Sequence, residues 1–176
     1  MKNMTLTLDS IKSDVIDSFA QYNFRTTHEH TFAHKESVAL AFHSESYGMK
    51  INTCISLLPN MMISGIDLVN VPKMKYRPML EMINLINMDL DYGHLMLMSG
   101  SQDLLLEAKL FLSDNTANKE MISLVIRSLV NNCYRYLPLV ERLLDSSEKP
   151  WDIYDKYYDP ARLLIQDALQ DSSAEE

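Results

Sequence analysis

Three histidines with the chemistry of metal ligands stand close together near the start of the chain. His28 and His30 are separated by one residue, and His34 follows four positions later. On a β-strand, side chains two positions apart project from the same face, and imidazole nitrogens bind zinc or nickel. The spacing differs from the helical HExxH pattern of zinc proteases. The cluster therefore predicts either a metal site or a polar strand that faces solvent.

Carboxylates also occur in groups that acid–base or metal chemistry would use, first at Asp89 and Asp91 and again at Asp152, Asp155 and Asp159. A charged loop is the favoured interpretation of both groups. The chain has 4 glycines and contains neither a glycine-rich phosphate loop nor a GxSxG sequence. We therefore expect a protein without enzymatic activity and without a cofactor.

Composition limits the partners of the chain. Its 176 residues, 47% hydrophobic and 23% charged, predict an ordinary folded domain. The formal net charge of -8 opposes binding to nucleic acid and to anionic membranes, because both attract lysine and arginine. No apolar stretch reaches the length of a membrane span, so a cytoplasmic protein is expected. Cys54 and Cys133 are predicted to be reduced thiols in the core.

Methionine and aromatic residues supply the candidates for protein binding. The chain has 12 methionines, whose unbranched side chains adapt to irregular surfaces or fill cores. Met61 and Met62 precede serine and glycine and are expected to be exposed. Trp151 and Tyr154 would share a helical face, which either docks on the protein itself or anchors a partner. These four residues are the predicted protein-binding site.

Periodicity predicts helices and strands in a fixed order. A first helix, capped by Asp9 or Ser10, carries an apolar stripe from Ile11 to Tyr22. A period of two then predicts extended segments, which are Arg25–Phe32, Val38–Phe42, Ile51–Leu57 and Met61–Val71.

The second half of the chain returns to helical spacing and contains one clear hairpin. A helix spans Met79–Leu90, and a hairpin joins Gly93–Met98 to Leu104–Leu112 through Gly100 and Ser101. A long helix is expected over residues 118–144, kinked or interrupted at Pro138. A last helix should begin at Asp159 and Pro160 and carry Leu163, Leu164, Ala168 and Leu169 on its apolar side, before an unstructured tail from Ser172 to Glu176.

This order of elements resembles the type III secretion chaperone-like fold and, within it, the YbjN-like family of bacterial sensory transduction regulators. The likeness lies in the helix Leu80–Asn87 with its two asparagines and in the strand Gly93–Leu97. The segments Leu104–Leu112 and Met121–Leu143 also fit the family pattern. Residues 1–146 would form the domain, and residues 147–176 an aromatic-rich extension with a short helix.

The resemblance implies an α+β fold in which a twisted antiparallel sheet has helices packed on one face, in the order α-β-β-β-α-β-β-α, followed by a C-terminal helical extension. It further implies a homodimer in the bacterial cytoplasm that holds an apolar segment of a protein partner, by chaperoning or regulation. Two alternatives remain open. One is a metal-dependent hydrolase that uses His28, His30 and His34, and the other is a regulator that acts only through dimer contacts.

Overall fold

The computed structural model describes residues 7–32, 36–45, 49–57, 60–112 and 119–157. These segments form a six-stranded antiparallel sheet and four α-helices, so the predicted α+β class is confirmed. The strands are β1 (Arg25–Phe32), β2 (Ser37–Ser44), β3 (Met49–Leu57), β4 (Asn60–Asn70), β5 (His94–Leu97) and β6 (Asp103–Phe111). The helices are α1 (Leu8–Ala20), α2 (Tyr76–Asn87), α3 (Lys119–Asp145) and α4 (Pro150–Tyr157), with a short 3-10 turn at Lys73–Lys75 before α2.

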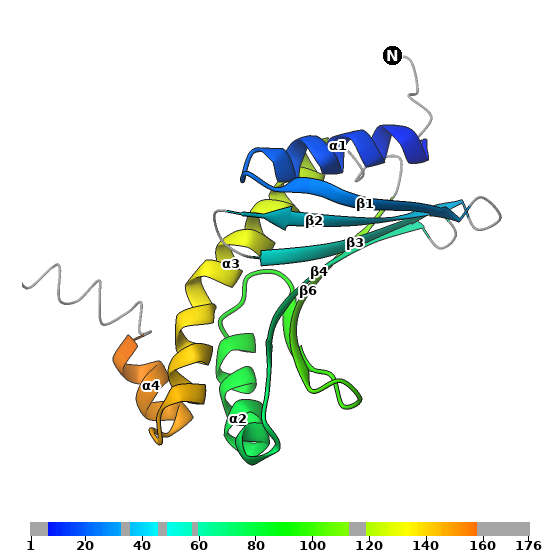
Figure 1. Ribbon diagram of the computed structural model, residues 1–176. Coiled ribbons are helices and arrows are strands. Elements are labelled where there is room, and N and C mark those ends of the chain that lie inside the picture. Colours follow the sequence, from blue (N-terminus) through cyan, green and yellow to red (C-terminus); the bar gives the residue numbers. More distant parts are fainter. Residues whose placement is uncertain (1–6, 33–35, 46–48, 58–59, 113–118, 158–176) are drawn as a thin grey trace, which may run out of the picture.

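The sheet is a meander that ends in a hairpin. Its strand order is β1-β2-β3-β4-β6-β5, and every neighbouring pair is antiparallel. The family pattern has three strands before the second helix, whereas four precede α2 here, as the alternating residues predict. Figure 1 shows the strong twist of the sheet, because β1 to β3 cross the picture while β4 and β6 turn downward.

The hydrophobic core lies between the sheet and the helices, all of which lie on one side of it in Figure 1. Alternate residues of the central strands face this core in register. Leu40 pairs with Thr53 and Thr53 with Ser64, and the residues two positions away on the same face of each strand are apolar and buried. The Thr53 and Ser64 hydroxyls, 2.9 Å apart, hydrogen-bond to each other, so neither polar group is buried without a partner.

Helix α3 is the longest element and provides most of the apolar cover. It is 27 residues long, close to its predicted bounds, and Pro138 lies within it. Eleven of its residues are buried, including Ile126, Leu129, Cys133, Tyr136 and Val140. This buried stripe explains why a helix containing an internal proline persists, since tertiary packing dominates over intrinsic propensity.

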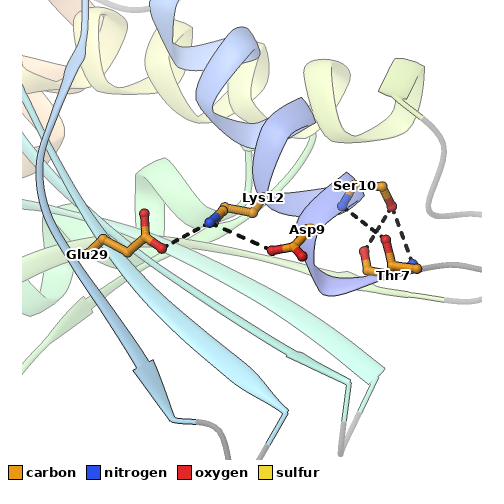
Figure 2. A network of polar contacts seen from close by, with 5 residues as sticks. All are labelled: Thr7, Asp9, Ser10, Lys12 and Glu29. Carbon is orange, nitrogen blue, oxygen red and sulfur yellow. Dashed lines mark hydrogen bonds and ion pairs between the residues drawn. The ribbon is translucent and has the colours of Figure 1, made fainter.

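Helix α1 begins with a local cap and is joined to the edge strand of the sheet by an ion pair (Figure 2). Thr7, and not the predicted Asp9 or Ser10, is the N-cap residue. Its hydroxyl accepts a hydrogen bond from the Ser10 backbone N–H at 3.2 Å, and the Ser10 hydroxyl accepts one from the Thr7 N–H at 3.3 Å. Lys12 then pairs with Glu29 of β1 at 3.0 Å.

Helix α4 precedes the last helix that the sequence predicted, and it contains Trp151 and Tyr154, which were expected to share a helical face. Pro150 is its first residue, where a missing N–H has no cost because that group has no intrahelical partner. The helix packs against α2 and α3, and Ile153 is fully buried there. The helix expected from Asp159 and the tail from Ser172 lie outside the described residues.

Candidate functional site

One face of the sheet carries no helix. Its residues alternate with those of the core, and they form a row across all six strands: His28, Ala41, Asn52, Gly65, Glu107 and His94. A parallel row places Ala39 beside Cys54 and Cys54 beside Ile63. The centre of this uncovered face is therefore built from small side chains.

The small side chains leave a groove of about 400 Å³ on this face, which we call the sheet groove. Its floor and apolar walls include Ala39, Ala41, Gly65, Ile63 and Leu105. A Cβ atom at Gly65 would lie 3.0 Å from Leu105 Cδ1, so a larger residue there would displace the leucine. The shape of the groove thus depends on the absence of side-chain atoms along its middle.

Polar side chains surround the apolar floor of the sheet groove. Asn52 donates a hydrogen bond to Asp67 Oδ2 at 3.4 Å, and Glu107 pairs with Lys109 at 2.8 Å. His94 Nε2 lies 3.7 Å from Glu107 Oε1. An apolar centre within a polar rim is the usual organisation of a protein-binding surface.

The histidine cluster is only partly described. His28 lies on the wall of the sheet groove, and His30 stacks edge-on against Phe32 with ring centroids 4.3 Å apart. Both histidines project from the same face of β1, as their spacing predicts, because they pair with Ala41 and Ala39. His34 lies outside the described residues, and within the described ranges no three potential ligands converge on one point. The metal-dependent alternative stays a prediction.

The two candidate methionines separate onto opposite faces of β4. Met62 is fully buried, so its predicted exposure is wrong. It pairs with Ile55 and Leu110, both of which face the helices. Met61 pairs with Phe111, whose side chain is 73% exposed on the uncovered face. Of the two methionines, Met61 alone is in a position to touch a partner.

The two candidate aromatics also differ. Tyr154 donates a hydrogen bond to Asp89 Oδ2 at 3.0 Å and thereby joins α4 to the end of α2. Burial, and then the neighbouring carboxylate of Asp89, raise its pKa, so the hydroxyl stays protonated and remains a donor. Trp151 stacks on the Tyr154 ring but remains 62% exposed. Tyr154 therefore docks on the protein itself, whereas Trp151 presents an exposed aromatic surface.

The two thiols have different surroundings. The structure joins neither of them in a disulfide, and only Cys133 lies in the core, where burial raises its pKa to about 12. Cys54 is exposed and lines the sheet groove, because it lies on the opposite face of β3 from Thr53 and Ile55. The prediction of a core position is wrong for Cys54.

The sheet groove itself was missed from the sequence, although a signal for it was present. Strand β2 alternates large residues, Val38, Leu40 and Phe42, with the alanines at 39 and 41. Small apolar residues on the non-core face of a strand leave room that polar residues would fill. The large residues of this alternation predict the core face of β2, and the alanines predict small side chains on its other face.

The fold agrees with the predicted type III secretion chaperone-like architecture. No protein-family model matches the sequence, and no curated protein does. Among solved structures, a chain from the crystal structure of the ExsC–ExsE complex matches with a TM-score of 0.51 and 13% identity. The alignment covers 81% of this chain and 100% of that chain. At this identity the likeness establishes the fold.

Among the helices of the described segments, none combines the length and the apolar character that crossing a membrane requires.

Proposed function

We propose that this chain is a non-enzymatic, chaperone-like protein-binding module that holds an apolar segment of a protein partner in the sheet groove. The observation that carries the proposal is the uncovered sheet face with its small-residue floor. Uncovered apolar surface rimmed by polar groups is typical of binding sites. The similar structure is that of the ExsC–ExsE complex, which supports the same role.

The polar side chains at the rim of the sheet groove could select among different partner segments. Asp67 and Glu107 lie on one side of it, and His28 lies on another. Apolar side chains of a partner would fill the space over Ala39, Ala41 and Gly65, while its polar groups would meet this rim. Met61, Trp151 and Tyr154 remain the other candidates for contact, and the YbjN-like family, the bacterial cytoplasm and the homodimer remain part of the proposal.

The test replaces Ala41 by arginine, which puts a long charged side chain onto the groove floor. We expect affinity capture from extract of the source organism to recover a partner with the wild-type protein and to lose at least 90% of it with Ala41→Arg, since roughly 1.4 kcal/mol is a tenfold change in affinity. Thr31→Arg is the matched control, because Thr31 is an exposed residue of β1 that pairs with Val38, away from the groove face.

Cys54 provides an independent measurement on the same groove. It is exposed, whereas the thiol of Cys133 is buried with a raised pKa, so an alkylating reagent should modify Cys54 selectively near neutral pH. The captured partner should slow this modification in the wild-type protein. A partner that binds Ala41→Arg normally and leaves Cys54 as reactive as before would contradict the proposed site.

A further inference from the structure

A second groove runs along the exposed side of the first half of α3, on a different surface from the sheet groove. Its volume is about 490 Å³, and we call it the α3 groove. Met121, Leu124 and Val125 form its apolar end, and Leu124 is 45% exposed. Arg127 and Arg135 add positive charge along the same side of the helix.

The lining of the groove combines an apolar stretch with two arginines and one carboxylate, Asp91, so it carries one net positive charge in a protein whose net charge is -8. Arg127 is exposed, and the described residues include no carboxylate in an ion pair with it. Ser128 and Asn131 lie between the arginines and supply further hydrogen-bonding groups. An occupant that complements this surface has an apolar side and acidic groups.

Helix α4 leads the chain toward this groove. Pro150, at its start, lies with Leu143 on the wall of one surface hollow. Four residues later, Tyr154 and Tyr136 both donate hydrogen bonds to Asp89 Oδ2, at 3.0 and 3.5 Å. Successive residues of α4 therefore lie beside progressively earlier residues of α3. The next residue of α3 in that direction is Arg135, at one end of the groove.

The sequence after α4 has the complementary character. Residues 158–176 contain Leu163, Leu164, Ala168 and Leu169 on the predicted apolar side of a helix. The same segment contains five acidic residues and a single arginine. At about 1.5 Å per residue, a helix from 159 to 171 is ~20 Å long, which matches the distance along α3 from Met121 to Arg135.

We propose that the α3 groove is the docking site of the chain's own C-terminal segment, residues 158–176. The segment's leucines cover Met121, Leu124 and Val125, and its carboxylates lie toward Arg127 and Arg135. The direction of α4, the matching length and the opposite charges support this occupant over an unrelated protein. The proposal is independent of the sheet groove and of its partner.

The test measures amide hydrogen exchange of residues 160–171 by mass spectrometry on the full chain. We expect these amides to exchange at least tenfold more slowly in the wild-type protein than in Leu124→Asp, because an aspartate in the apolar end of the groove repels the segment. Leu80→Asp is the matched control, since Leu80 is 51% exposed on α2, outside the lining of the α3 groove, and its replacement should leave the protection unchanged.

Charge reversal provides a second test that leaves the apolar floor intact. Arg127→Glu should accelerate exchange of the segment severalfold, and adding Asp167→Lys with Asp171→Lys should restore the protection. Wild-type amides that exchange at the unprotected rate, or that ignore both Leu124→Asp and Arg127→Glu, would overturn the proposal. Protection that rises with protein concentration would also overturn it, because the occupant would then be a second copy.

Discussion

At the scale of single residues, the proposed binding function depends on which side of each strand a residue occupies. Ala41 and Leu40 are neighbours in sequence, yet Leu40 fills the core and Ala41 lines the sheet groove. The register carries this division across the sheet, from β2 through β3 and β4 to β6. One position along a strand therefore separates a residue that holds the fold from one that can bind a partner.

Met61 and Met62 test this division directly. Met62→Ala should lower the free energy of unfolding by about 2–5 kcal/mol, because it removes a fully buried side chain and leaves a cavity. Met61→Ala, on the uncovered face, should change it by less than about 1 kcal/mol. Urea denaturation followed by circular dichroism measures both values. Equal losses for the two variants would contradict the register of β4.

The same pair shows what the sequence could and could not predict about the site. A period of two puts Met62 on the same face as Ser64 and Ile66, which is enough to predict its burial. The expectation of exposure rested instead on the neighbouring serine and glycine, whose polarity and size are typical of turns. Ser64 is buried because Thr53 lies opposite to accept or donate its hydrogen bond, and that pairing is a property of the sheet.

At the scale of elements, most helices and strands follow from local patterns. The bounds of β6 and α3 agree closely with the periodicity, because each of these elements buries one regular face. Strand β1 has its predicted bounds although none of its residues is buried, and α2 begins and ends three residues earlier than predicted. Helix α4 does not follow, since its eight residues form too short a segment for periodicity to resolve. It is held by Ile153 in the core and by the Tyr154–Asp89 hydrogen bond, which are tertiary contacts.

Helix α1 allows a quantitative test of a local signal. Thr7→Ala removes the cap hydroxyl that accepts from the Ser10 N–H, and we expect it to lower the free energy of unfolding by about 1 kcal/mol. Ser13→Ala is the control, because this exposed position lies inside the helix, where alanine is the best helix former and should be neutral or slightly stabilising. Thermal denaturation compares the two. A loss as large for Ser13→Ala would mean that the cap is not the cause.

At the scale of the whole molecule, the arrangement of the layers decides which surfaces are free. The helices lie on one face of the sheet and leave the other uncovered (Figure 1). Strand patterns predict that each strand has an apolar side and a second side, but they do not say whether another layer covers the second one. For this reason the fold class was predictable, whereas the alanines of β2 indicate small side chains on the second face but not whether that face is uncovered.

Association of two copies is the property of the whole molecule that the resemblance predicts and that the exposed face of α2 supports. Leu80, Asn84 and Met88 follow one another at intervals of four, and all three are exposed. A two-fold axis beside this stripe would bring it against its own copy, and a stable dimer buries about 1,200–2,000 Å² in total. The stripe would then form the centre of the interface, where a charge is poorly tolerated.

Sedimentation equilibrium at high micromolar concentration measures this association. We expect a dimer for the wild-type protein and a monomer for Leu80→Asp, because the aspartate would be desolvated at the centre of the interface. Leu124→Asp is the control and should remain dimeric, since Leu124 lies in the α3 groove. A monomeric wild-type protein would refute the dimer itself. A Leu80→Asp dimer beside a Leu124→Asp monomer would instead move the interface from α2 to α3.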